Sequence, residues 1–185
     1  MSRLSPLDAI IRELDRAGIP HMLAGSFASS YHGDPRTTND IDLVIAPTRT
    51  SLEAFVRSLD PTGYYVSLEA ALEAFGRQGQ FNVIVLESGW KVDLILRKDR
   101  AFSRLEFERR ELAAIEETQV FVATAEDTIV AKLEWARAGE SERQLRDVAG
   151  ILELRGSSLD RGYIERWVAE LGLHAEWERV RRTLD

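Results

Sequence analysis

The stretch Asn39-Asp40-Ile41-Asp42-Leu43-Val44-Ile45 decides the fold, because it sets two carboxylates into an otherwise apolar strand. Side chains alternate across a β-strand, so Asp40 and Asp42 share one face and the aliphatic residues between them share the other. Two unit negative charges roughly 6–7 Å apart repel by about 2.5 kcal/mol at an effective dielectric constant near 20. A divalent cation would turn that repulsion into attraction, since Mg²⁺ takes carboxylate oxygens together with substrate phosphates.

A structural explanation of the same two acids also exists. Asp40 would close a turn after Arg36-Thr37-Thr38-Asn39, and Asp42 would simply face water. Taken alone, an Asp-x-Asp pattern fits this explanation well. Two further motifs, one upstream and one downstream, favour the metal site instead.

The upstream motif is a strand that runs into a glycine and a serine. Residues 20–24 are expected to form a short strand, followed by Gly25-Ser26 and a helix. Glycine permits backbone angles and close approaches that other residues do not. Ser26 has a hydroxyl for a phosphate, and a helix N-terminus presents free N–H groups to an anion. The same pair is also an ordinary helix N-cap.

The downstream motif is a third acid in a strand. Residues 81–86 and 90–96 are expected to form a hairpin through Glu87-Ser88-Gly89. Asp93 interrupts the apolar run of the second strand. Burying a lone carboxylate is costly unless it is paired or bound to a metal. The alternatives are an edge strand on which Asp93 faces water, or a pairing of Asp93 with Lys91.

Together these motifs resemble the nucleotidyltransferase superfamily with the DNA polymerase β-like fold, and within it the AbiEii-type bacterial toxin–antitoxin branch. The run from Gly33 to Asp42 is similar to that branch's Arg-x-Thr-x-Asp-h-Asp stretch, where h is hydrophobic. Residues 124–133 resemble its Glu-Asp-x-h-x-x-Lys-h helix, and residues 141–148 the Arg/Asp-containing helix that follows. The resemblance spans most of residues 20–155 and does not include the last thirty.

The resemblance implies that Asp40, Asp42 and Asp93 are catalytic and hold Mg²⁺ or Mn²⁺. Asp93 would also activate the acceptor hydroxyl. Phosphoryl and nucleotidyl transfer depend mainly on positioning and on neutralising charge in an in-line displacement, which agrees with these roles.

The resemblance further implies that four residues bind the nucleotide: Gly25, Ser26, Arg36 and Lys132. The first two would contact the triphosphate, and the two cations would neutralise its charge. Arg36 also fits a solvated loop position. Lys132 also fits a pairing with its helix neighbours Glu126, Thr128 or Glu134.

The order of the expected elements indicates an α+β fold. Strands and helices alternate first and helices then dominate, which predicts a small mixed sheet followed by a C-terminal helical region. We expect a polymerase-β-like nucleotidyltransferase core over residues 1–123. Residues 124–185 would form a helical region that closes the cleft.

The function implied is Mg²⁺-dependent transfer of a nucleoside monophosphate from an NTP to a hydroxyl of an acceptor. The acceptor would be tRNA, a protein or a small molecule such as an aminoglycoside, with a cognate antitoxin or toxin protein as partner. The alternative is a non-catalytic binding module of the same fold that acts through a protein partner.

The amino-acid composition limits the kinds of metal site, location and acceptor that are expected. The 185 residues carry a net charge of −7 and no cysteine, which excludes disulfides and thiolate metal sites and fits the cytoplasm. No stretch has the length of a membrane span. The acidic balance argues against sequence-blind nucleic-acid binding. A basic segment after the Asp93 strand is either a patch for RNA or a solvated helix face: Arg97, Lys98, Arg100, Arg104, Arg109 and Arg110, interrupted by Glu106, Glu108 and Glu111.

Overall fold

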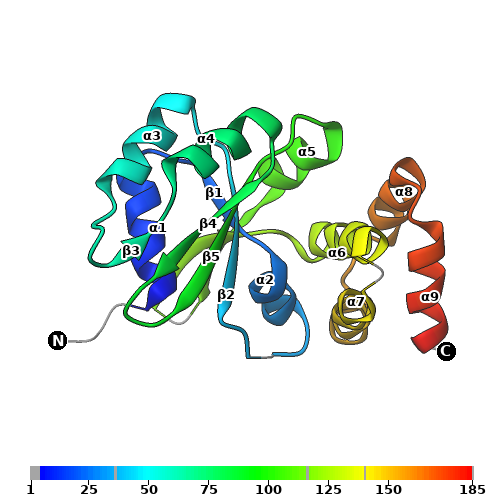
Figure 1. Ribbon diagram of the computed structural model, residues 1–185. Coiled ribbons are helices and arrows are strands. Elements are labelled where there is room, and N and C mark those ends of the chain that lie inside the picture. Colours follow the sequence, from blue (N-terminus) through cyan, green and yellow to red (C-terminus); the bar gives the residue numbers. More distant parts are fainter. Residues whose placement is uncertain (1–4, 36, 116, 140, 185) are drawn as a thin grey trace. The chain divides into compact units, whose positions relative to one another are not determined.

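A computed structural model describes residues 5–35, 37–115, 117–139 and 141–184 (Figure 1). The chain forms two compact units. The sheet unit comprises Met1–Ala24 and Thr38–Val122, and the helical unit comprises Gly25–Thr37 and Ala123–Asp185. Residues 25–37, which the sequence predicts to be part of a core over residues 1–123, thus belong to the helical unit.

The sheet unit is built on one seven-stranded mixed sheet, counted over the described residues, in the order β3-β4-β5-β2-β1-β7-β6. Two neighbouring pairs are parallel, β2 with β5 and β1 with β7, and the others are antiparallel. The strands are β1 (His21–Leu23), β2 (Asp40–Ile45), β3 (Tyr64–Tyr65), β4 (Gln80–Val85), β5 (Trp90–Leu96), β6 (Glu111–Ile115) and β7 (Thr118–Val122). The predicted mixed sheet of an α+β fold is confirmed.

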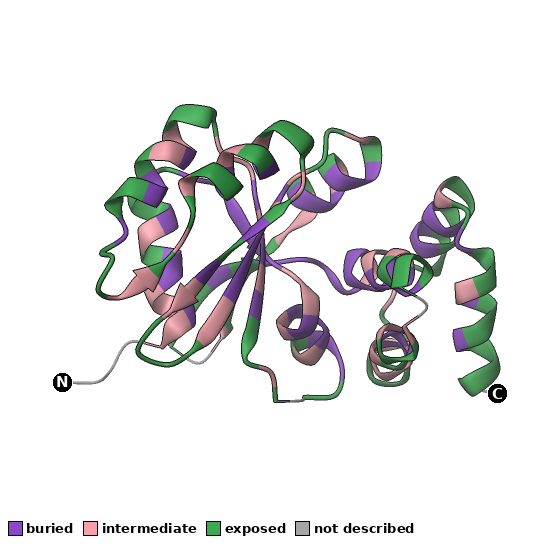
Figure 2. Cartoon of the chain, in the orientation of Figure 1, coloured by how far each residue is buried: buried purple, intermediate pink, exposed green. Residues whose placement is uncertain are grey.

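Four helices of this unit lie in the described residues: α1 (Pro6–Arg16), α3 (Arg49–Ser58), α4 (Leu68–Arg77) and α5 (Ala101–Arg109). Helix α1 begins where a capping residue precedes a proline: the Ser5 side chain accepts a hydrogen bond from the Asp8 amide at 3.1 Å. Its apolar stripe faces inward, and Ile10 and Leu14 are fully buried. Figure 2 shows the same division into a buried and an exposed side along the helices of this unit.

The core of the sheet unit includes the apolar face of β2. Ile41, Leu43 and Ile45 have no exposed surface, whereas Asp40 is exposed and Asp42 is half-buried. Strand β5 joins β4 through the predicted hairpin, in which Gly89 has a φ of 71°. The alternation of acids and aliphatics therefore orients β2 as the sequence predicts.

Strand β6 directly follows helix α5, since the helix ends at Arg109 and the strand begins at Glu111. Strand β6 is at the edge of the sheet and pairs only with β7 among the described strands. Glutamate and alanine have low strand preference, so this strand depends on its pairing with β7.

The helical unit contains, in its described residues, α2 (Gly25–His32), α6 (Ala125–Gly139), α7 (Glu142–Arg155), α8 (Arg161–Leu171) and α9 (His174–Leu184). Thr124, which precedes α6, accepts a hydrogen bond from the Asp127 amide at 3.2 Å and donates one to the Asp127 carboxylate at 2.6 Å. Tyr163 of α8 donates to the other oxygen of that fully buried carboxylate. The predicted C-terminal helical region is confirmed.

None of the described helices combines the length and apolar character that a transmembrane helix requires.

Candidate active site

The acids of the sheet unit share one face of two neighbouring strands. Strands β2 and β5 pair in parallel, with Asp40 beside Lys91 and Asp42 beside Asp93. Residues in register on adjacent strands point to the same side of a sheet, and such strands lie about 4.8 Å apart. Asp40, Asp42, Lys91 and Asp93 therefore form one charged group on this face, which we call the acid face.

The two oxygens of the Asp93 carboxylate have different surroundings. Its Oδ2 accepts a hydrogen bond from Lys91 Nζ at 2.7 Å, whereas its Oδ1 is buried with no hydrogen-bond partner in the described part of the chain. Strand β5 is an interior strand and only 8% of Asp93 is exposed. The alternative that Asp93 lies on an edge strand and faces water is wrong, and the alternative pairing with Lys91 is confirmed.

The pKa of Lys91 responds to the combined negative charge of the acid face. Its pKa is raised above the usual lysine value, first by the hydrogen bond to Asp93 and further by the negative charges of Asp93, Asp40 and Asp42. Burial of the ammonium acts in the opposite direction but is outweighed. All three carboxylates thus act electrostatically on one cation.

The acid face fits a divalent metal as a partial ligand set. Among the residues described, no three His, Cys, Asp or Glu side chains are gathered closely enough to hold a metal ion by themselves. Mg²⁺, however, is usually bound through one or two carboxylates plus substrate phosphates and water. Asp42 and Asp93 lie side by side and supply hard oxygen donors of this kind. One of these donors, Asp93 Oδ1, has no hydrogen-bond partner among the described residues.

The glycine–serine turn begins helix α2 of the helical unit. Gly25 has a φ of 57°, a left-handed conformation that only glycine adopts without strain. Ser26 follows it and is buried. In the sheet unit, the preceding residue Ala24 donates its amide to the Asp42 carbonyl at 2.9 Å, so β1 ends directly beside one of the acids.

Of the two cations predicted to bind phosphate, the structure describes only Lys132. Arg36 lies outside the described residues. Lys132 is only 4% exposed on α6, and its Nζ donates to Asp147 Oδ2 of α7 at 2.6 Å. This contact reaches a different helix from the one that carries the expected partners of Lys132.

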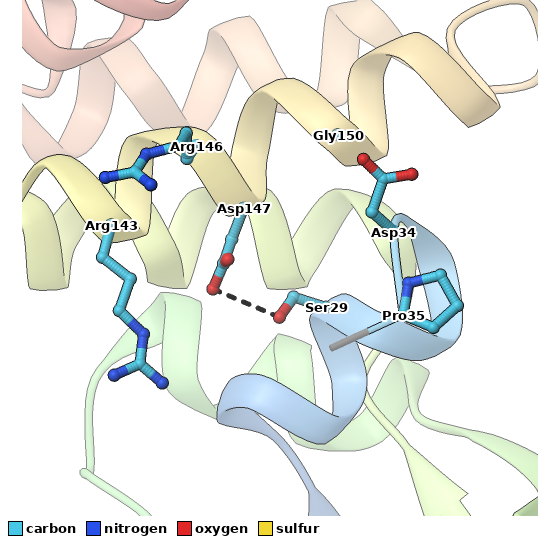
Figure 3. A pocket seen from close by; sticks show the side chains of 7 residues that line it. All are labelled: Ser29, Asp34, Pro35, Arg143, Arg146, Asp147 and Gly150. Carbon is cyan, nitrogen blue, oxygen red and sulfur yellow. Dashed lines mark hydrogen bonds between the residues drawn. The ribbon is translucent and has the colours of Figure 1, made fainter. Parts of the chain in front are cut away.

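The described part of the helical unit also has a cavity of about 360 Å³. Its lining residues come from α2, the segment after it, and α7: Ser29, Asp34, Pro35, Arg143, Arg146, Asp147 and Gly150. Figure 3 shows Asp147 pointing toward Ser29, whose hydroxyl donates to Asp147 Oδ2 at 3.3 Å. Residues 141–148 carried part of the family resemblance, but none of these side chains was assigned a role from sequence.

Solved structures with a similar fold include an antibiotic adenylyltransferase and a nucleotidyltransferase-like protein. The antibiotic-resistance factor ANT(2'')-Ia aligns over 96% of this chain and 95% of its own with a TM-score of 0.58 and 17% identity. An antigenic nucleotidyltransferase-like protein from Paracoccidioides brasiliensis aligns over 92% and 89%, with a TM-score of 0.53 and 17% identity. The lincosamide antibiotic adenylyltransferase LnuA aligns over 83% and 99%, with a TM-score of 0.53 and 10% identity.

At these identities the likeness establishes the fold, which is that of the nucleotidyltransferases. No profile of a known protein family matches the chain, and no curated protein matches it.

Proposed function

We propose that this protein is a Mg²⁺-dependent nucleotidyltransferase that moves a nucleoside monophosphate from an NTP to a hydroxyl of an acceptor. The observation that carries the proposal is the pairing of Asp42 with Asp93 on one sheet face, where one buried Asp93 oxygen has no hydrogen-bond partner among the described residues. The nucleotidyltransferase fold supports it. Catalysis of this kind requires oriented carboxylates more than any covalent chemistry.

Each acid would have a distinct task. A bound Mg²⁺ or Mn²⁺ would neutralise the charge that develops on the phosphoryl oxygens. Asp40 and Asp42 would supply its carboxylate ligands, from the more open part of the acid face. Asp93 Oδ1, which accepts no hydrogen bond from the part of the chain that the structure describes, would supply a further ligand or accept the proton of the acceptor hydroxyl.

The nucleotide's phosphates would be bound by Gly25, Ser26, Arg36 and Lys132, as the resemblance implies. The positive φ of Gly25 supports part of this role, because a backbone without a Cβ leaves room for an anion at the start of α2. The assignment of Lys132 rests on the resemblance, and its contact to Asp147 places its positive charge at the junction of α6 and α7.

For the acceptor we favour a small, cationic, hydroxyl-bearing molecule. Two structural neighbours act on antibiotics, and one was solved with adenylyl-2''-tobramycin. A net charge of −7 favours a cationic acceptor over RNA. A tRNA or protein acceptor, with a cognate toxin or antitoxin, is the second possibility, supported by the AbiEii-type resemblance, and a cytoplasmic location would suit either.

The proposal is tested by incubating the protein with Mg²⁺ and each α-labelled NTP in turn, with aminoglycosides, total RNA and lysate protein as separate acceptors. Transfer of label to one acceptor class, absent with Asp42→Ala, supports the proposal and identifies the class. Calorimetry should show NTP binding that requires Mg²⁺. NTP binding that is unchanged by chelation of the metal, with no labelled product, would reject it.

The alternative of a non-catalytic binding module is favoured by two observations. Lys91 already neutralises Asp93, and no complete three-ligand metal group is formed within the described residues. In that case Asp42→Ala would leave the affinity for a captured protein partner unchanged, and no NTP would be consumed by the wild type.

A further inference from the structure

The basic segment that follows β5 is not a uniformly solvated surface. Two of its arginines bind side chains close to them in sequence: Arg104 pairs with Asp99, and Arg100 Nε donates to Ser103 Oγ at 2.9 Å. Arg97 and Arg110 differ from these. Neither forms an ion pair with any carboxylate of the described residues.

Aromatic rings position these two guanidinium groups. Phe107 of α5 is only 4% exposed, and its ring centre lies 4.1 Å from the Arg110 guanidinium carbon and 5.8 Å from that of Arg97. Arg110 also lies 4.9 Å from the ring centre of Phe121 on β7. Stacking on a ring face orients a guanidinium without neutralising it.

The donors of the two groups are only partly satisfied. The Nε atoms of Arg97 and Arg110 are both buried and have no acceptor among the described residues. Arg110 Nη1 donates to the Phe107 carbonyl, which carries no net charge. Burial lowers the pKa of Arg110, and the neighbouring positive charge of Arg97 lowers it further. Two like charges are thus held together with no counter-ion among the described residues, which costs free energy unless an anion joins them.

We infer that Arg97 and Arg110 form a binding site for a phosphate-type oxyanion, with one guanidinium fork on each side of it. Planar guanidinium groups with free N–H donors match phosphate oxygens in a bidentate way. Arg97 follows β5 four residues beyond Asp93, or about 13 Å along the strand, so the site is separate from the acid face. The inference does not rest on the proposed enzymatic function.

The ligand's phosphate could belong to a small metabolite or to a nucleic-acid backbone. The net charge of −7 favours the small molecule, since backbone binding depends on an extended basic surface.

The direct test follows the side-chain Nε–H signals of Arg97 and Arg110 by ¹H–¹⁵N NMR while inorganic phosphate is added, with NaCl at matched ionic strength as reference. Both signals should shift along one saturating curve in the wild type. In Arg97→Gln the Arg110 signal should respond with an affinity at least about tenfold weaker, because one charged fork is lost. Arg104→Gln, which removes a cation paired with Asp99, is the matched control and should bind like the wild type.

A short single-stranded RNA in the same titration distinguishes the two sources. A response to phosphate alone assigns the site to a small ligand, and a response to RNA, with or without phosphate, assigns it to the nucleic-acid backbone. Absence of any saturating shift overturns the inference, as does equal weakening in Arg97→Gln and Arg104→Gln. The test uses Arg97→Gln because Arg97 is only half-buried, so its replacement should not prevent folding. It therefore does not depend on whether an Arg110→Gln variant folds.

Discussion

At the scale of single residues, the two oxygens of Asp93 have different surroundings: one is hydrogen-bonded to Lys91, and the other is buried with no partner within the described ranges. Asp93→Asn keeps the shape of the side chain but removes its charge and its ability to accept a proton. We expect nucleotide binding to survive and turnover to fall by about 10²–10³-fold or more. Single-turnover kinetics with labelled NTP, together with calorimetry, separate the two effects. Normal turnover in this variant would disprove the role assigned to Asp93.

The matched variant is Asp42→Ala, on the neighbouring strand. Because Asp42 is expected to hold the metal directly, its loss should remove Mg²⁺-dependent NTP binding as well as turnover. Calorimetric titration with and without Mg²⁺ measures this. If both variants lost binding equally, the division of tasks between the two acids would be incorrect.

Lys91 offsets part of the negative charge of the acid face in the absence of metal, so Lys91→Met should raise the affinity for Mn²⁺ while it lowers the stability of the metal-free protein. Manganese binding is measured by electron paramagnetic resonance, and stability by thermal unfolding in chelator. Arg77→Met, which removes a cation from an exposed ion pair with Glu73, is the control and should change neither quantity. An unchanged Mn²⁺ affinity in Lys91→Met would show that the ammonium does not compete with metal.

The raised pKa of Lys91 fixes the pH range of its effect on stability. A lysine whose pKa is raised by folding stabilises the native state below its unfolded pKa of about 10.4, and that contribution is lost as pH rises through the folded pKa. The stability difference between wild type and Lys91→Met in chelator should therefore be constant near neutral pH and shrink only above about pH 10.

The sequence predicted which face of β2 carries the acids, for a physical reason. The period of two in a strand placed Asp40 and Asp42 on one face, and the structure brings Lys91 and Asp93 to that face through strand pairing. The contact between Lys132 and Asp147 was not predictable in the same way. It joins two helices whose packing depends on the whole unit, and helical periodicity alone does not show which faces meet.

At the scale of secondary-structure elements, Gly33 lies where the end of α2 approaches α7 within the helical unit. A Cβ on Gly33 would lie 2.9 Å from the Ile151 backbone nitrogen, which has little freedom to move. Gly33→Ala should therefore destabilise the protein by about 1–3 kcal/mol, as overpacking does. Chemical denaturation measures the change, and a stability equal to wild type would mean that the helices can separate at no cost.

Gly76 provides the opposite case in helix α4, since a Cβ there would contact nothing within 4 Å. Gly76→Ala should stabilise the protein by about 0.5–1 kcal/mol, because alanine loses less backbone entropy in a helix. Both substitutions add the same methyl group. Opposite changes in the free energy of unfolding, measured in the same denaturation experiment, would therefore reflect the different surroundings of the two added methyl groups.

Elements with local signals were predictable, and those that depend on distant partners were not. Helix α1 has its cap, its proline and its apolar stripe in consecutive residues, and the structure matches each of them. Strand β6 has glutamate and alanines, and only its pairing with β7 makes it a strand.

At the scale of the whole molecule, the net charge of −7 bears on the choice of acceptor. If the acceptor is a polycationic amine, its KM should rise several-fold between about 50 and 300 mM NaCl, because salt screens long-range attraction. The kcat should stay nearly constant. Steady-state kinetics with an uncharged hydroxyl acceptor provide the reference, and an equal rise for both acceptors would exclude electrostatic attraction as its cause.

The helical unit is discontinuous in sequence, since α2 is encoded before the greater part of the sheet and α6–α9 after it. Helix α2 packs on α6 and α7, and His32 bonds to the Ala123 carbonyl at 2.7 Å. A gene fragment that starts at residue 123 would therefore yield four helices with an uncovered hydrophobic side. Producing this half separately would require a redesigned chain in which residues 25–37 are fused to the carboxyl-terminal segment through a new linker.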